Sequence, residues 1–287
     1  MNAAPRDSRE WGLLLVHHLF GLDELHFGLW PPGAAPRLGD LPAAQRRYTE
    51  HLLDRLPPPA AAPRVLDAGC GTGSLMLELW RRGYRPAGVS PSPALNARAR
   101  ARLARAGAGP VEIHDGRFED LPVGRLGGAY DLVIFSESFQ YIKMPQVFDV
   151  LAALLRPGGR FLVCDVFSRR GPRHDPIRSG HPLARFFDLV ARAPFEQERD
   201  EDLTERTSPT VALLEEVLQR RLRPALALSD AYLARRHPLG WRVLRLLAGR
   251  RWRRARRHYL EGEYHQRAFE AAKTYRLFVY RRREGTC

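Results

Sequence analysis

Between residues 64 and 167 the sequence alternates between short apolar runs and longer segments with helical spacing. The apolar runs predict strands at 64–69, 86–90, 111–115, 130–136 and 160–167. The segments between them, which end at glycines, predict helices at 73–83, 93–107 and 145–159. Short connections between such elements require right-handed crossovers. The fold class that follows is α/β, with a Rossmann-like, mostly parallel sheet and helices on both faces.

The segments on either side of this alternation are richer in helix signals. Upstream, the sequence predicts a mainly helical stretch at 11–30 and a helix closed by prolines at 41–56. Downstream, it predicts a helix at 183–193, a polar strand at 195–203, helices over 209–237 and 239–273, and a last strand at 274–282. Ligands of open parallel sheets bind outside the carboxyl ends of the strands. The turns that follow the strands are therefore the candidate site.

The turn after the first strand contains three glycines, Gly69, Gly71 and Gly73. Glycines in such a turn let the backbone come close to a ligand. A dinucleotide loop would have a glycine where Ser74 stands and an acid at the end of the second strand, which ends at Ser90 instead. The Gly-Lys-Ser/Thr of a phosphate-binding loop is also absent. The spacing therefore disfavours a dinucleotide and leaves another ligand or a purely structural turn.

The net charge of +14 is concentrated in one segment. Ten arginines and no acid occur between Arg235 and Arg257, within a helical pattern that also carries an apolar stripe of Trp241, Leu244, Ala248, Trp252, Ala255 and Tyr259. A solvated face over a packed lid, a surface for anionic lipid, and a docking face for an acidic acyl carrier or a coenzyme A thioester are all compatible with this pattern. We expect the segment to form a lid and part of an acceptor pocket.

The sequence contains no apolar run long enough for a membrane-spanning helix, and its first residues make a poor signal peptide. Cys70, Cys164 and Cys287 are far apart and have no metal-ligand spacing, which suits a reducing compartment. We expect a cytoplasmic protein without a metal site. Peripheral membrane contact through the arginine-rich segment is the alternative.

Five segments of the chain resemble one enzyme superfamily. VLDAGCGTGS (65–74) resembles the first motif of class I S-adenosylmethionine-dependent methyltransferases. Four further segments resemble the later motifs of this superfamily and occur in the same order: GVSPSPALNARARARL (88–103), HDGRFEDLP (114–122), YDLVIFSESFQYI (130–142) and LLRPGGRFLVCDVF (154–167). The upstream LHFGLWPPG and AAQRRYTEHLLDRL are similar to the N-terminal cap of the small-molecule and lipid branch, near cyclopropane fatty acid synthases and tocopherol methyltransferases.

The resemblance covers nearly the whole chain and implies its organisation. An N-terminal helical cap would occupy residues 1–57, and the methyltransferase domain would occupy 58–287. The sheet would have seven strands, with a helical insertion at about 209–273 between the last two. The implied cofactor is S-adenosyl-L-methionine.

The resemblance also implies roles for the first turn. Gly69, Gly71 and Gly73 would let the backbone approach the methionyl part of the cofactor, and the helix that begins near Thr72 would offer amides to its carboxylate. Asp67 would face the amino group, with a structural role in capping the loop as the alternative. The implied cofactor site further includes Cys70 and Ser136.

The adenosine end of the cofactor would lie at the next two strand ends. Ser90 would bind the ribose, since the acid of many relatives is missing there. Asp115 would accept from the adenine amino group, with Glu119 and Asp120 as rivals for this role. The ring would receive a backbone N–H from Gly116 or Arg117 and would pack on Phe118.

Three residues are candidates for catalysis, and each has a structural alternative. Glu137 would act as a base or would order its loop, and Tyr141 would position the acceptor or pack the loop. His26 in the cap is a candidate general base, and Trp30 would cover the cofactor.

The predicted reaction is methyl transfer to a small, hydrophobic or carrier-linked acceptor at oxygen, nitrogen or carbon. The residues after the fourth strand, SESFQYI, lack the Asn/Asp-Pro-Pro-Tyr/Phe motif of nucleic-acid amino-methyltransferases, so no nucleic acid is expected as a partner. A cyclopropane synthase-like enzyme, an RNA methyltransferase and a scaffold that only retains the cofactor are the alternatives.

Overall fold

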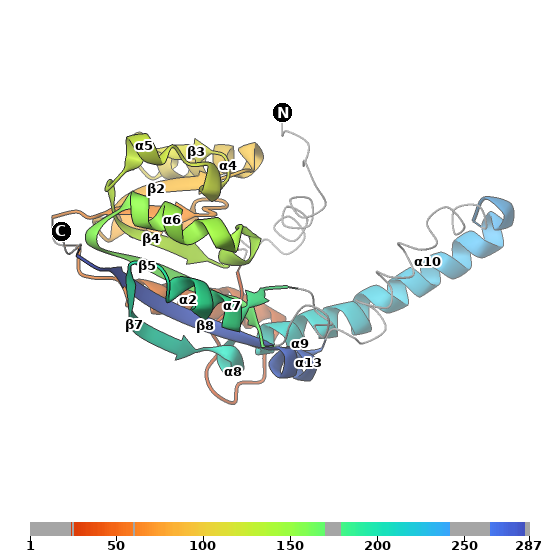
Figure 1. The fold of residues 1–287 in the computed structure, drawn as a ribbon. Helices are drawn as coiled ribbons and strands as arrows, with labels where there is room; N and C mark the ends of the chain where they lie inside the picture. Colours follow the sequence, from red (N-terminus) through yellow and green to blue (C-terminus); the bar gives the residue numbers. More distant parts are fainter. Residues whose placement is uncertain (1–23, 25, 60, 170–178, 242–264, 285–287) are drawn as a thin grey trace.

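The computed structural model describes residues 24, 26–59, 61–169, 179–241 and 265–284. A sheet with the strand order β3-β2-β1-β4-β5-β8-β7 forms its centre (Figure 1). A short β6 pairs with β5. The strands are β1 Arg64–Ala68, β2 Arg85–Ser90, β3 Ile113–Asp115, β4 Tyr130–Ser136, β5 Leu155–Ser168, β6 His181–Pro182, β7 Phe195–Asp202 and β8 Lys273–Arg282. This architecture confirms the predicted Rossmann-like α/β class.

The strands are parallel except around β8, which runs antiparallel to both β5 and β7. Because β8 is reversed, its first residue, Lys273, pairs with the last residue of β5, Ser168. The start of β8 therefore lies at the carboxyl edge of the parallel strands, where ligands of such sheets bind. Tyr275 enters the candidate site in this way.

The sheet differs from the prediction in two places. The two-residue β6 adds an eighth strand to the expected seven. β5 begins at Leu155, which pairs with Tyr130 across a register shift, whereas the sequence predicted a helix up to the glycines at 158 and 159. The helix before β5 accordingly ends at Leu154.

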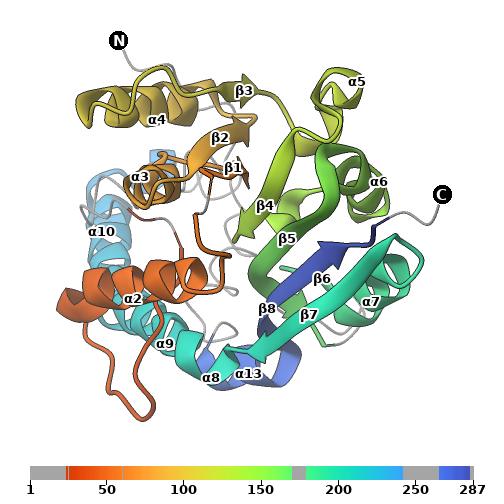
Figure 2. The same ribbon diagram turned by 90° about the vertical axis from the view of Figure 1, so that its left-hand side faces the viewer.

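Helices cover both faces of the sheet, as predicted (Figure 2). One face carries α2 Leu41–Leu53, α3 Ser74–Arg81 and α4 Pro93–Arg105, and the other carries α5 Val123–Leu126, α6 Met144–Leu154 and α7 Leu183–Val190. Successive strand residues point to opposite faces, so Leu132 and Ile134 pack in the core under α2 and α3, while Val133 and Phe135 pack under α6 and α7. Three short 3-10 turns complete the layers: η1 Leu38–Asp40, η2 Phe118–Asp120 and η3 Phe139–Tyr141.

An aromatic cluster fills the face under α6 and α7. Phe186 of α7 is fully buried at its centre and stacks on Phe278 of β8 at a ring-centroid distance of 4.9 Å. Its ring also meets Phe167 edge-on at 5.2 Å. This cluster fastens the antiparallel β8 to the helices of that face.

Replacing Phe186 with alanine should lower the free energy of unfolding by about 3–5 kcal/mol, because a buried ring leaves a cavity that its neighbours fill only in part. Urea denaturation measures the loss. Phe187→Ala on the same helix is the matched control, since Phe187 is only partly buried. If Phe186→Ala loses no more stability than Phe187→Ala, Phe186 is not the centre of the aromatic cluster.

The predicted insertion between the last two strands is present. Its described helices are α8 Thr204–Thr207, α9 Pro209–Glu216, the π-helical turn η5 Val217–Leu222, α10 Arg223–Arg236 and α13 Gln266–Ala272. α10 extends away from the sheet, and none of its residues is buried (Figure 1). The predicted helix at 209–237 is confirmed. The apolar stripe beyond Trp241, and the arginines from 242 onward, lie outside the described residues.

Among the described helices, none has the length and apolar character needed to span a membrane.

Candidate active site

The glycine loop between β1 and α3 has backbone conformations that favour glycine, with φ of +89° at Gly69, +50° at Gly71 and +75° at Gly73. A Cβ at Gly69 would overlap the Ser138 side chain, and one at Gly73 would lie 2.7 Å from the Cβ of Ala99. Among the residues that the structure describes, a Cβ at Gly71 would meet nothing closer than the Gly69 carbonyl oxygen at 3.9 Å. Packing thus requires Gly69 and Gly73, whereas Gly71 faces open space.

The helix after the loop begins slightly later than predicted. Gly73 is the N-cap, and α3 starts at Ser74 rather than near Thr72. The loop therefore leads directly into the N-terminus of a helix, whose free amides and dipole favour an anionic group. This arrangement fits the predicted binding of a carboxylate.

Asp67 lies on β1, just before the loop, and is only 3% exposed. Burial, with a contribution from nearby Glu24, raises the pKa of Asp67 to about 7. Among the residues that the structure describes, none forms a hydrogen bond with the Asp67 carboxylate. Within the described residues, the Asp67 carboxylate therefore makes no capping hydrogen bond to the loop. It could accept hydrogen bonds from a cationic group of a ligand.

Asp67→Asn should stabilise the ligand-free chain, and the gain should depend on pH. The folded state holds the Asp67 proton up to about pH 7, whereas an unfolded aspartate releases it near its ordinary pKa. The wild type therefore loses stability as the pH rises from about 4 to 7, and the neutral asparagine does not. We expect the variant's advantage to reach about 2–4 kcal/mol at pH 8. Denaturant melts across this range measure it, with the exposed Asp149→Asn as control. If the difference in unfolding free energy between Asp67→Asn and the wild type does not change with pH, the pKa of Asp67 is not raised by burial.

The cap reaches the glycine loop through Glu24 and His26. The Glu24 carboxylate accepts a hydrogen bond from the Ser74 hydroxyl and lies 3.1 Å from His26 Nε2. Gln45 on α2 holds the segment by donating to the backbone carbonyls of both residues. His26 Nδ1 lies 2.7 Å from the Phe27 carbonyl oxygen.

These contacts favour the charged form of His26. Burial alone would lower the pKa of its imidazole, but the hydrogen bond and charge of Glu24 outweigh burial and raise it. Both ring nitrogens face acceptors, the Phe27 carbonyl and the Glu24 carboxylate, so the imidazolium suits this position. A role of His26 as general base stays a prediction.

Glu137 follows β4 and has a left-handed backbone, with φ of +52°, which is uncommon for a residue with a side chain. Its Oε1 accepts hydrogen bonds of 2.6 Å from the Phe27 N–H and the Tyr275 hydroxyl. Burial raises the pKa of Glu137, against lowering contributions from His26 and these two donors. The contacts order the loop between the cap and β8. The base role remains a prediction.

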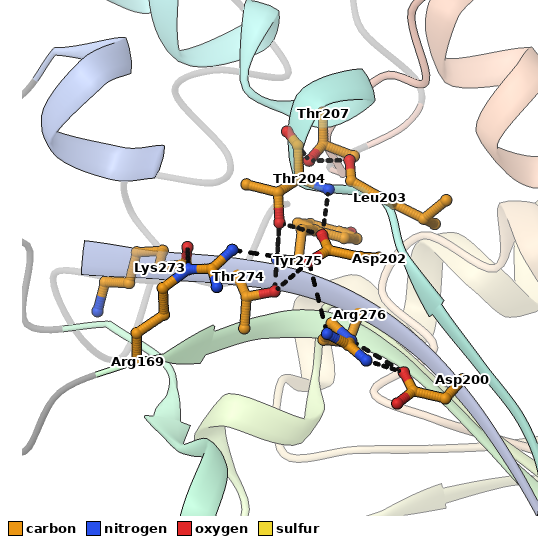
Figure 3. A network of polar contacts seen from close by, with 10 residues as sticks. All are labelled: Arg169, Asp200, Asp202, Leu203, Thr204, Thr207, Lys273, Thr274, Tyr275 and Arg276. Atoms are coloured by element: carbon orange, nitrogen blue, oxygen red, sulfur yellow. Dashed lines mark hydrogen bonds and ion pairs between the residues drawn. The ribbon is translucent and has the colours of Figure 1, made fainter. Parts of the chain in front are cut away.

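A polar network fixes the strand position of Tyr275 (Figure 3). The Tyr275 backbone N–H donates to the Thr204 hydroxyl at 2.9 Å. Asp202 at the end of β7 accepts from the Thr204 N–H at 2.9 Å and from the Thr274 hydroxyl at 3.2 Å. Arg276 adds an ion pair to Asp202 at 3.5 Å. β7, α8 and β8 are thereby locked at the edge where Tyr275 meets Glu137.

The ends of β2 and β3 lie side by side and share hydrogen bonds. The Ser90 carbonyl accepts from the Gly116 N–H at 3.1 Å and from the Asn96 side chain at 2.9 Å. Asp115 accepts from Asn96 at 2.7 Å and from Arg100 at 2.9 Å, and these two donors lower its pKa. Because the Gly116 N–H is already used, Arg117 becomes the better candidate for donating to an adenine ring.

The other predicted adenine contacts differ in exposure. Phe118 is buried and meets Phe135 edge-on at 5.0 Å, so its ring packs in the core. The Glu119 side chain is 4% exposed and lies 3.9 Å from Arg117. Asp120 is exposed. The choice among Asp115, Glu119 and Asp120 stays a prediction.

Cys70 belongs to the glycine loop, and Ser136 is the last residue of β4. Cys70 is buried, and its thiol faces the Asn96 side-chain oxygen at 3.9 Å. The Ser136 hydroxyl bonds to the Tyr48 hydroxyl of α2 at 3.0 Å. The Tyr48 ring in turn lies 4.3 Å from the His26 ring. Tyr48 thus connects the cap to the end of β4.

Two predicted residues have surroundings unlike those expected. Trp30 is 2% exposed and packs with Leu41 and Leu213, and its indole N–H donates to the Thr210 hydroxyl at 2.9 Å. This position joins the cap to the insertion, so its role as a cofactor cover stays a prediction. Tyr141 is 51% exposed, and the choice between positioning the acceptor and packing the loop stays a prediction.

Sequence reasoning missed three residues: Glu24, which bonds to Ser74 after the glycine loop, and Tyr48 and Tyr275, which bond to Ser136 and Glu137 at the end of β4. Tyr48 carried a signal as part of the predicted helix at 41–56, and Tyr275 as part of the predicted last strand. Within the described part of the chain, no group of three or more His, Cys, Asp or Glu side chains could hold a metal ion.

The strand order and the glycine loop after β1 define a class I methyltransferase fold. The geranyl diphosphate C-methyltransferase from Streptomyces coelicolor A3(2) shares this fold with a TM-score of 0.66 at 19% identity, over 97% of this chain and 100% of that one. Residues 65–159 match the family model of a methyltransferase domain. Residues 65–159 therefore form a methyltransferase domain, and the sequence relatives and the shared fold support the resemblance to class I S-adenosylmethionine-dependent methyltransferases that the motifs indicate.

Sequence relatives support this placement. The chain is 38% identical to magnesium-protoporphyrin O-methyltransferase of Rhodobacter capsulatus over 103 residues, which cover 36% of this chain and 44% of that enzyme. It is 29% identical to methyltransferase GfsG of Streptomyces halstedii over 211 residues, which cover 66% of this chain and 71% of that enzyme. The match to the first relative thus spans less than half of that relative's length.

Proposed function

We propose that this protein transfers a methyl group from S-adenosyl-L-methionine to a small acceptor molecule. The observation that carries the proposal is the glycine loop, which connects the strand of the buried Asp67 to the N-terminus of α3 and in which, among the described residues, a Cβ at Gly71 would meet nothing within 3.9 Å. A zwitterionic amino-acid group needs an anion on one side and a cationic or dipolar donor on the other, and these residues supply both.

Each part of the cofactor has residues that fit it. Asp67 would accept from the ammonium group, and the amides of α3 would donate to the carboxylate. Ser90 at the end of β2 would bind the ribose, and Asp115, its pairing partner at the end of β3, would bind adenine together with Arg117. When bound, the cofactor supplies a methyl group on a positively charged sulfur.

The chain's own contribution is to hold the acceptor in line, exclude water and accept a proton. Glu137 is the proposed proton acceptor, because the cap and β8 hold its carboxylate in place. The surroundings of Glu137 are aromatic: the Phe27 ring stacks on Tyr275 at 5.8 Å, and Tyr48 meets Tyr275 edge-on at 6.3 Å. Such walls favour a hydrophobic acceptor of natural-product, lipid or quinol type.

The insertion is proposed to act in acceptor delivery. Leu228 and Tyr232 of α10 are 74% and 65% exposed, close in sequence to the exposed Arg235 and Arg236. Apolar and cationic side chains on one protruding helix suit an acceptor that arrives on an acidic carrier or in an anionic membrane.

The experiment has two steps. Calorimetry with S-adenosyl-L-methionine tests the cofactor, and absence of binding would overturn the proposal. Incubation with methyl-labelled cofactor and a panel of phenols, quinols, carrier-linked acyl groups and unsaturated phospholipids then tests transfer. NMR of a labelled product separates an O-, N- or C-methyl group from a cyclopropane ring.

A further inference from the structure

The cap places a second carboxylate beside Asp67. Glu24 is close enough for its charge to act on Asp67, and its side chain is 23% exposed. It is held at the loop by the Ser74 hydroxyl, which belongs to the first residue of α3. Asp67 of β1 therefore precedes the glycine loop, and Glu24 of the cap contacts the residue that follows it.

The two acids differ in how their charges are balanced. Glu24 pairs with His26, and the hydrogen bonds from His26 and Ser74 keep its pKa low despite burial. Asp67 is more deeply buried and has no hydrogen bond from a described residue. Two carboxylates held close together in a buried place repel each other, and either a proton on one of them or a cation between them relieves this repulsion. A positively charged ligand group between Glu24 and Asp67 would therefore be bound favourably.

We propose that Glu24 and Asp67 together bind the ammonium group of the cofactor's methionyl part, so that the cap supplies half of the ammonium site. This inference rests on the proposed function and extends it to a residue outside the glycine motif. An ammonium group has three N–H donors, and two carboxylates can accept from it at once. The His26 imidazolium keeps Glu24 ionised for this task.

The cap is fastened in a way that suits this role. The Leu29 N–H donates to the Ala44 carbonyl, and the Trp30 N–H donates to the Arg206 carbonyl of the insertion, both at 2.8 Å. The Phe27 N–H binds Glu137, as described above. Segment 26–30 thus connects the ammonium site to the loop after β4 and to the insertion, which are the parts proposed to contact the acceptor.

The test compares two ligands on wild type and Glu24→Gln by calorimetry. S-Adenosylhomocysteine carries the ammonium group, whereas 5′-methylthioadenosine lacks the whole amino-acid part. Glutamine keeps an oxygen for Ser74 but removes the charge. We expect Glu24→Gln to weaken S-adenosylhomocysteine binding about tenfold or more and to change 5′-methylthioadenosine binding less than about twofold. Asp67→Asn should show the same selectivity.

Glu50→Gln is the matched control, because Glu50 is an exposed acid of the cap helix α2. It should leave both affinities unchanged. Unaltered S-adenosylhomocysteine binding by Glu24→Gln would overturn the inference and leave the proposed function intact. Equal weakening of S-adenosylhomocysteine and 5′-methylthioadenosine binding would also overturn the inference, since Glu24 would then only support the fold. Failure of the wild type to bind either ligand would remove the proposed function itself.

Discussion

Gly71→Arg is expected to abolish binding of S-adenosyl-L-methionine while the chain stays folded. The new side chain would extend into the open space in front of the loop, because nothing in the described structure lies within 3.9 Å of a Cβ there. Calorimetry should show a loss of at least about 100-fold in affinity, equivalent to about 2.7 kcal/mol. The left-handed backbone at Gly71 should cost a further 1–2 kcal/mol, roughly, in stability.

Gly107→Arg separates these two effects. Gly107 also has a left-handed backbone, with φ of +77°, and a Cβ there meets nothing within 4 Å, but it follows α4 rather than β1. It should lose similar stability in thermal melts and bind the cofactor like the wild type. If both variants bind equally well, the open space at Gly71 does not receive the cofactor.

Glu137→Gln is expected to lower kcat for methyl transfer by about 10²- to 10⁴-fold, the usual contribution of a positioned base. Glutamine still offers an oxygen to the Phe27 N–H and the Tyr275 hydroxyl, so the loop should keep its conformation. Stability should not fall, since burial already disfavours the charge on Glu137. The rate is measured on the acceptor identified by the labelled panel.

The pH dependence of the rate distinguishes a base from a contact that only orders the loop. Burial raises the pKa of Glu137, so the acidic limb of the wild-type profile should lie above the ordinary range of a glutamate. Glu137→Gln should lose this limb. Tyr275→Phe removes one donor to Glu137 but keeps the ring, and it should retain the limb at a reduced rate. An unchanged rate in Glu137→Gln would assign Glu137 a structural role.

The parallel strands β1 and β4 could be predicted well because they are short apolar runs bounded by glycine, serine or aspartate. β4 has the predicted bounds, 130–136, and α4 starts at the predicted Pro93. Prediction failed at Leu155, where a helix-forming sequence changes to strand because Leu155 pairs with Tyr130. Propensity is local, and such a pairing is a tertiary contact that overrides it. β6 has only two residues and gives no periodic signal.

The candidate site was predictable only where it consists of one contiguous motif. The glycine loop lies within a few residues of Asp67, and its spacing was informative. Glu24 meets Ser74 across 50 positions, and Tyr275 meets Glu137 across 138. No spacing rule connects residues so far apart, because the folded sheet alone brings them together. Asp115 shows a related limit, since its pairing with Arg100 depends on how α4 packs beside β3.

The reversed last strand has a consequence for the order in which the protein becomes competent during synthesis. Chains emerge from the ribosome N-terminus first, at about 5–20 residues per second. The cap and the glycine loop appear early, but Tyr275, which fixes Glu137, arrives only with β8. A nascent chain that has already exposed its glycine loop therefore lacks the Tyr275 contact to Glu137, the proposed proton acceptor. The donor's reactive methyl group would meet an assembled centre only when translation has passed residue 282.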